Sequence, residues 1–213
     1  MANFAGWKVH IYNNTYIYKT MRQIVLVLAA VMLVFVTMTA CAKRASKVST
    51  ESSATDGKRI LVAYFSATGT TEAVARQIAK ATGGKLYKIT PVEAYTAADL
   101  DWTVPTSRSC RENDDPKSRP AIVKDLADLD SYDVIYLGYP NWWNMAPRII
   151  NTFVETYGLK GKTVIPFMTS GGSKIANSVR LLRSAYPDVK WSDGRLLNHV
   201  SQQEIDSWVK EAK

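Results

Sequence analysis

Residues that build metal centres and disulfide frameworks are scarce in this sequence. Its 213 residues include only two cysteines, Cys41 and Cys110, and two histidines, His10 and His199. These four residues are far apart, and none stands at a metal-ligand spacing from another. The sequence therefore excludes a disulfide scaffold and predicts no metal site.

Negative charge is missing from the first 41 residues, which hold Lys8, Lys19 and Arg22 but no acid. Setting these three aside leaves 24 of the 27 lysines and arginines against all 19 acidic residues, an excess of five positive charges. The remaining basic residues are spread along the chain and form no stripe, so we expect no nucleic-acid partner. The charge predicts only a mild preference for acidic partners or anionic surfaces.

Motifs for nucleophilic catalysis and for nucleotide hydrolysis are also absent. There is no G-x-S-x-G elbow, and His199 has no sequence neighbour that suggests a triad. The string Gly158-Leu-Lys-Gly-Lys-Thr163 has two residues between its glycines, where a P-loop requires G-x-x-x-x-G-K. A lone cysteine such as Cys110 is usually a small packing residue. We therefore assign no catalytic side chain.

An apolar run near the amino terminus has the layout of an export signal. Ile24 to Val36 is unbroken, follows Arg22, and leads into small residues that end at Cys41. Met38-Thr-Ala-Cys41 resembles a bacterial lipobox, in which the cysteine is lipidated and becomes the first mature residue. We therefore expect residues 1–41 to be an N-terminal extension and signal peptide, with Met21 as the natural initiator. The alternative is an uncleaved membrane anchor.

The next residues read as a flexible tether. Residues 42–57 are rich in serine, threonine, alanine and charge, with almost nothing to bury. They lead to a domain at 58–213. Either interpretation of the leader places this domain outside the cytoplasm, anchored to a membrane and facing the periplasm or the cell exterior.

The domain opens with a strand, a loop of small hydroxyl residues and a helix. Ile60 to Phe65 is an apolar run typical of a strand buried on both faces. Ser66-Ala67-Thr68-Gly69-Thr70-Thr71 follows, and a helical apolar period begins inside this loop. Unpaired N–H groups and the helix dipole favour an anion there. Since the loop has no lysine or arginine, it suits a phosphate monoester that is held and not cleaved. The alternative is an ordinary N-cap with spare threonines.

Apolar runs alternate with helical patterns through the rest of the domain. Strands are expected at 60–65, 86–89, 132–139, 163–168 and 189–197, with an irregular segment at 91–120. This alternation predicts an α/β fold with a five-stranded parallel sheet. Ligands in such sheets bind beyond the carboxyl ends of the strands.

Three strands end in loops that suit a single ligand. Besides residues 66–71, these are Pro140-Asn141-Trp142-Trp143-Asn144 and Thr169-Ser170-Gly171-Gly172. Two adjacent indoles offer a stacking surface for a flat ring, although tryptophan is also common in cores. The glycine-containing loop offers backbone groups to a polar ring edge. Together the loops predict a site for a mononucleotide with a planar head.

The motifs in these loops, taken in order, resemble the flavodoxin family, specifically its bacterial lipoprotein-like branch. They are Phe65-Ser-Ala-Thr-Gly-Thr-Thr71, Leu137-Gly-Tyr-Pro-Asn-Trp-Trp143 and Pro166-Phe-Met-Thr-Ser-Gly-Gly-Ser173. The resemblance covers roughly residues 58–212. It implies a doubly wound flavodoxin-like sandwich that binds FMN, with residues 66–71 around the phosphate. It also implies Pro140, Asn141, Trp142 and Trp143 beside the ring, and residues 169–172 at the polar edge of the ring.

The net charge and one position depart from what is usual in that family. Electron-carrying flavodoxins are usually acidic, whereas this domain is basic. Related loops often carry glycine after the tryptophan pair, where this chain has Asn144. Asparagine tolerates positive φ better than most residues.

The resemblance leaves three functions open. The domain can be an electron-transfer protein that docks a redox partner, or an FMN-dependent reductase of a small quinone-like acceptor. The third is a membrane-anchored binding protein without redox chemistry. For a reductase, we expect the long 91–120 segment to wall a pocket, with Trp102 or Arg108 as a contact.

Overall fold

The computed structural model describes residues 57–212. The predicted leader at 1–41, with the predicted lipidation site Cys41, lies outside the described residues, as does the predicted tether apart from Gly57. Within the described part of the chain, no helix is both long and apolar enough to cross a bilayer.

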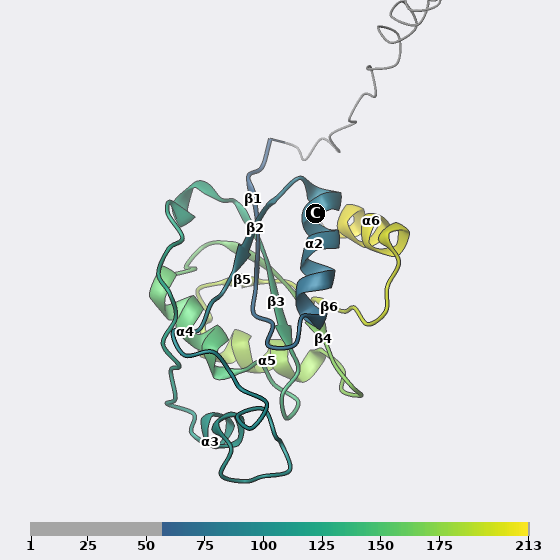
Figure 1. Ribbon diagram of the computed structural model, residues 1–213. Helices are drawn as coiled ribbons and strands as arrows, with labels where there is room; N and C mark the ends of the chain where they lie inside the picture. The colour runs from purple at the N-terminus through teal and green to yellow at the C-terminus, as the bar shows by residue number, and fades with distance from the viewer. Residues whose placement is uncertain (1–56, 213) are drawn as a thin grey trace, which may run out of the picture. The chain divides into compact units, whose positions relative to one another are not determined.

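The centre of the domain is a parallel sheet of six strands (Figure 1). Its order is β2-β1-β3-β4-β5, and β6 also pairs with β4. The strands are β1 (Ile60–Tyr64), β2 (Lys85–Lys88), β3 (Val134–Pro140), β4 (Thr163–Thr169), β5 (Lys190–Trp191) and β6 (Arg195–Leu196). Every strand pair is parallel. The predicted α/β fold is confirmed, with one strand more than expected.

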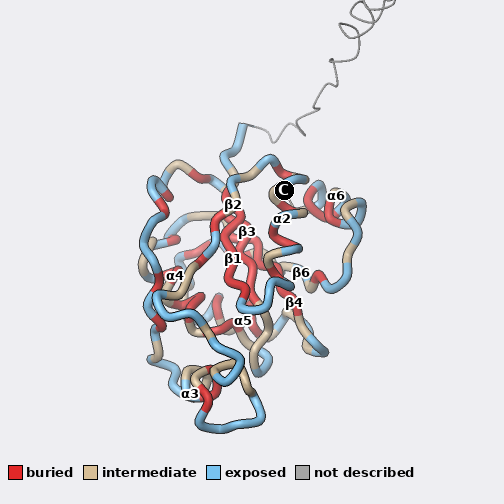
Figure 2. Tube along the Cα trace, viewed as in Figure 1, coloured by how far each residue is buried: buried red, intermediate tan, exposed pale blue. Residues whose placement is uncertain are grey.

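Helices cover both faces of this sheet. α2 (Thr70–Thr82) and α6 (Gln202–Glu211) pack on one face, and α4 (Arg148–Tyr157) and α5 (Ala176–Ala185) pack on the other (Figure 1). Each face has its own apolar core, and the strands between them are buried almost throughout (Figure 2). Because β1 and β3 pack against helices on both faces of the sheet, their residues form continuous apolar runs, as expected for a parallel sheet.

The segment expected as one final strand is divided in two. β5 pairs with the start of β4, at Thr163 and Val164, and β6 pairs with its end, at Phe167 and Met168. Pro166 lies between these pairings, and proline has no N–H to donate to a neighbouring strand. Gly194, with φ of 68°, turns the chain between the two short strands.

The 91–120 segment, expected to be irregular, contains the helix α3 (Arg108–Asp114). Ser107 caps it by accepting a hydrogen bond from the Cys110 N–H at 3.4 Å. The sequence of α3 has no apolar period, which is why the pattern did not reveal it. An isolated bridge between Pro91 and Ile122 closes the base of the segment. We call residues 91–120 the excursion.

We expect Gly138→Ala to destabilise the domain by about 1–3 kcal/mol, the usual cost of overpacking. Gly138 pairs with Phe167 across β3 and β4, and a Cβ at this position would overlap the Phe167 ring. Urea unfolding of the purified domain measures the change.

The matched control is Gly171→Ala, because a Cβ there meets nothing within 4 Å. Its free energy of unfolding should stay within about 0.5 kcal/mol of wild type. The double variant G138A/F167L should lose less stability than the sum of its single changes. Additive losses would contradict the proposed contact.

Candidate functional site

Three loops meet at the carboxyl edge of the sheet, after the neighbouring strands β1, β3 and β4. We call them the hydroxyl loop (66–71), the tryptophan loop (140–144) and the glycine loop (169–173). The Asn141 N–H donates to the Thr169 carbonyl at 2.8 Å, which joins the second loop to the third. The Thr71 and Thr169 hydroxyls lie 2.8 Å apart and join the first to the third. The structure therefore brings all three predicted loops together.

The hydroxyl loop presents the amino end of α2 to solvent. The Ser66 hydroxyl accepts a hydrogen bond from the Gly69 N–H at 3.0 Å, which folds the loop back on itself. Gly69 has φ of 90° and stands at the N-cap, where no side chain caps the helix. The first N–H groups of α2 are thus left for another acceptor, and the helix dipole favours an anion among them.

The four hydroxyls of this loop divide by burial. Thr68 and Thr70 are exposed, with their oxygens 3.3 Å apart. Ser66 and Thr71 are buried, and Thr71 bonds to Thr169. The exposed pair is available to a ligand, whereas the buried pair shapes the loop and braces it. The sequence did not reveal this division because all four residues have the same chemistry.

The tryptophan loop is a two-residue turn. Trp142 and Met145 exchange backbone hydrogen bonds of 3.0 and 2.9 Å. Between them, Trp143 and Asn144 have φ of 45° and 62°. Positive φ at both central residues is the geometry of a type I′ turn. Asparagine accepts this conformation readily, but a bulky tryptophan is strained in it.

The two tryptophans of this loop have different surroundings. The Trp142 ring lies edge-on to Phe65 and Tyr95, with centroids 5.7 and 5.5 Å apart, so it packs against the core. The Trp143 side chain is 39% exposed and free to contact a ligand. Of the two adjacent indoles, Trp143 is therefore the one that is exposed as a stacking surface for a flat ring.

Asn141 carries an unsatisfied polar atom beside these indoles. Its Oδ1 is buried and has no hydrogen-bond partner among the described residues. A buried acceptor without a donor is costly, so such an atom in a binding loop indicates a missing N–H or O–H group. This observation fits a ligand with a polar edge at the tryptophan loop.

The glycine loop is held by residues that the motifs did not include. The Asn198 side chain pairs with the Ser170 backbone, accepting from its N–H at 2.9 Å and donating to its carbonyl. The Ser170 hydroxyl accepts from the N–H groups of Gly172 and Ser173 at 3.2 and 2.9 Å. A Cβ built on Gly171 or Gly172 meets nothing within 4 Å, so this surface is open.

A second asparagine supports the tryptophan loop from α5. The Asn177 side chain donates to the Asn144 carbonyl at 2.9 Å. Single asparagines outside a motif carry no signal in a sequence, so neither Asn177 nor Asn198 was predicted.

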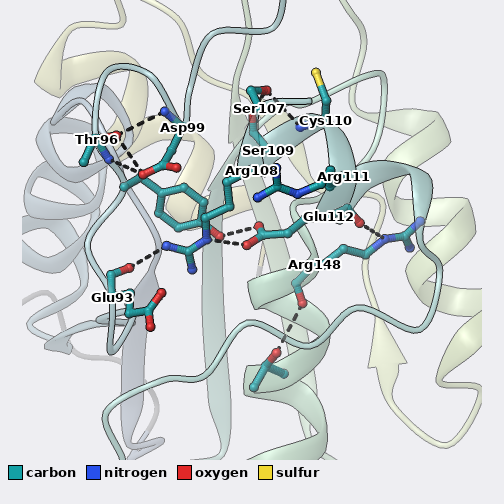
Figure 3. Close-up of polar contacts among 12 residues, drawn as sticks. Glu93, Thr96, Asp99, Ser107, Arg108, Ser109, Cys110, Arg111, Glu112 and Arg148 are labelled. Atoms are coloured by element: carbon teal, nitrogen blue, oxygen red, sulfur yellow. Dashed lines mark hydrogen bonds and ion pairs between the residues drawn. The ribbon is translucent and has the colours of Figure 1, made fainter. Parts of the chain in front are cut away.

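The excursion stands beside the tryptophan loop and is fixed to the body of the domain. Arg108 pairs with Glu112 at 2.6 Å and lies 4.0 Å over the Tyr95 ring. The Arg148 guanidinium of α4 donates to the Glu112 carbonyl (Figure 3). It also donates to the Asn113 carbonyl. Burial, and then the hydrogen bond to Glu112, raise the pKa of Tyr95, so it stays a neutral donor. These contacts give the excursion a defined position.

A cavity of about 250 Å³ lies between the excursion and the tryptophan loop. Its lining consists of Leu100, Trp102, Ser109, Asn141, Trp142 and Trp143. Trp102, one of the two contacts predicted for a pocket walled by this segment, therefore lines the cavity, and the residue is 73% exposed. Arg108 is not part of the lining, because its guanidinium is engaged by Glu112 and Tyr95.

Comparisons with solved structures find close relatives of this arrangement. A chain described as a flavoprotein from Bacteroides eggerthii is 54% identical, with a TM-score of 0.71. The match covers 73% of this chain and 98% of that one. A flavoprotein from Bacteroides uniformis is similar, at 53% identity and a TM-score of 0.70 over 72% and 99% of the two chains.

A more distant structure shares the fold. It is a flavoprotein from Lactobacillus acidophilus in complex with FMN, 23% identical, with a TM-score of 0.59 over 71% of this chain and 99% of that one. A comparison with curated proteins found no match. The family model for flavodoxin matches residues 59–212, which include the three loops and the excursion. The chain belongs to the flavodoxin family.

Proposed function

We propose that this domain binds FMN and transfers electrons between the flavin and a redox partner. We further propose that a lipid on Cys41 anchors it to a membrane outside the cytoplasm. Family membership supports the cofactor, and the lipobox-like sequence before the tether supports the anchor. Bound FMN supplies the redox chemistry, and the protein supplies position and electrostatics.

The hydroxyl loop is suited to the phosphate. It offers the free N–H groups at the start of α2, the exposed hydroxyls of Thr68 and Thr70, and open space at Gly69. Residues 66–71 contain no lysine or arginine, so the site holds a phosphate with neutral donors and the helix dipole. That chemistry favours retention of a monoester over phosphoryl transfer, for which positive groups stabilise the transition state.

The tryptophan and glycine loops are suited to the ring. The observation that carries this assignment is the buried, unpartnered Oδ1 of Asn141. The edge of a flavin ring has an N–H group that can donate to it. The exposed Trp143 indole gives a stacking surface, and the bare glycine loop leaves room for a flat ring on its other side.

A second candidate function is reduction of a small quinone-like acceptor. It is favoured by the cavity of about 250 Å³ that shares Asn141, Trp142 and Trp143 with the ring site. An electron carrier that docks a protein over the flavin edge needs no such cavity. The exposed Trp102 indole is placed to stack on a planar acceptor there.

The cofactor is tested by the absorption spectrum of residues 42–213 as purified and after addition of FMN. We expect flavin bands and one FMN per chain. Anaerobic reduction in steps then shows whether electrons enter singly, as in a carrier, or in pairs, as in a reductase. A colourless protein that takes up no FMN would contradict both functions and leave the non-redox binding protein.

We expect Asn141→Ala to weaken FMN binding about tenfold, because a net hydrogen bond of about 1.4 kcal/mol is lost. The free energy of unfolding of the apo domain should not fall by the cost of a lost bond, since Oδ1 has no partner there. Fluorescence titration and urea unfolding measure the two effects. Asn113→Ala, on the excursion, is the control and should leave FMN affinity unchanged. Equal affinities for both variants would exclude Asn141 as a ring contact.

We expect Trp102→Ala to raise the KM for a soluble naphthoquinone about tenfold, with kcat and FMN affinity nearly unchanged. The reason is loss of a stacking contact worth roughly 1 kcal/mol or more. Electron transfer to ferricyanide, which has no aromatic ring, should not change. Val104→Ala is the control, because Val104 is exposed on the same excursion but does not line the cavity. If both variants behave alike, the cavity is not an acceptor site.

A further inference from the structure

A second cavity lies at the opposite end of the sheet from the three loops. Since all the strands are parallel, the starts of β1, β3 and β4 share one edge of the sheet. The cavity there has a volume of about 400 Å³ and reaches the last turn of α6 at Val209 and Ala212. No residue of the three loops or the excursion lines it. Its chemistry therefore has to be explained separately from the cofactor site.

The inner surface of this cavity is largely apolar. The apolar lining residues are Ile60, Val134, Ile165, Val209 and Ala212. Ile165 and Val209 belong to the buried core, whereas Ile60, Val134 and Ala212 are only partly buried against it. The core on this face is thus left incompletely covered, and an apolar group would gain contact there.

Tyr136 adds a polar group to the same cavity. Its side chain is 1% exposed and its ring packs edge-on against Trp208 at 5.6 Å. Within residues 57–212 its hydroxyl makes no hydrogen bond. Burial raises the pKa of Tyr136 to about 12, so it remains protonated at neutral pH. Because Tyr136 lines the cavity, its O–H group can donate a hydrogen bond to an acceptor that binds there.

Basic side chains surround the opening. Lys58, Lys162 and Lys190 line this cavity, and an adjoining one of about 330 Å³ shares Lys58 and adds Arg59 and Lys85. The Lys162 ammonium already donates hydrogen bonds to the carbonyls of Asp130 and Tyr132, so we do not assign it to ligand binding. The acidic lining is limited to Asp133, whose carboxylate accepts from the Arg59 N–H. Even with the partial negative charge at the end of α6, the opening is electropositive.

We propose that this end of the domain binds the headgroup of an anionic phospholipid at a membrane surface. The phosphate lies beside Lys58 and Lys190, and the glycerol and first methylene groups cover the apolar floor of the same cavity. A free inorganic phosphate would use the lysines but leave that floor and the Tyr136 hydroxyl unfilled. An amphipathic anion uses all three features.

The position of this site in the chain supports the same occupant. Lys58 lies on the rim of the cavity, directly after the predicted tether. If residues 42–57 form the predicted flexible tether, they span on average roughly 20–25 Å, and a lipid on Cys41 would then hold the cavity close to the bilayer. The inference rests on the anchor under Proposed function but not on the cofactor. Each basic residue near an anionic surface adds about fivefold to binding.

The test uses residues 42–213, which lack the lipidation site. The protein is sedimented with vesicles of phosphatidylcholine alone or mixed with phosphatidylglycerol. We expect binding only to the mixed vesicles. The variant K58E/K190E should bind at least tenfold more weakly. The control K117E/K174E makes the same charge change on two exposed residues, one on the excursion and one directly after the glycine loop, and should lose less than about threefold. Equal losses would indicate non-specific charge attraction and overturn the proposal.

A second measurement separates the lipid from free phosphate. Dihexanoyl phosphatidylglycerol below its micelle concentration should raise the melting temperature of the domain, and inorganic phosphate at the same concentration should not. Tyr136→Phe should weaken binding of the short lipid about fivefold, while FMN titration shows that the variant is folded. Equal stabilisation by phosphate, or no effect of the short lipid, would overturn the proposal. If the wild-type domain binds the short lipid but not FMN, the proposed cofactor is contradicted and the proposed lipid site stands.

Discussion

The parallel pairing of β1, β3 and β4 is the constraint on which the site depends. It places the ends of three strands at one edge of the sheet, although their loops are separated by up to about a hundred residues. Thr169 then joins the loops, because its hydroxyl meets Thr71 and its carbonyl meets the Asn141 N–H. A shift of one residue in this register would turn Thr169 to the other face of the sheet and break the contact with Thr71.

The sequence was sufficient to predict the fold class and the meeting of three loops at one edge of the sheet. Short apolar runs alternated with helical patterns, and three of the runs were followed by loops of distinctive composition. Two elements were missed for identifiable reasons. α3 has no apolar face to produce a period, and the last strand is divided where Pro166 interrupts the pairing of its neighbour.

The sequence predicted that three loops lie together, as the structure shows, but it did not assign tasks to their side chains. Whether a threonine faces solvent, as Thr68 does, or braces two loops, as Thr71 does, depends on strands far away in sequence. The strained backbone at Trp143 and the support from Asn198 likewise arise only from tertiary contacts. Local pattern thus predicted which loops lie together, and long-range packing determined their geometry.

The two ends of the domain meet at the same place. Lys58, just before β1, and Ala212, at the end of α6, line one cavity, on the far side of the sheet from the cofactor loops. A short peptide can therefore join them without crossing the fold, which is the condition for circular permutation. New chain ends placed in a surface loop away from the three site loops would leave the geometry of the ring site unchanged. By the same geometry, the domain can be inserted into a loop of another protein as an independently folding unit.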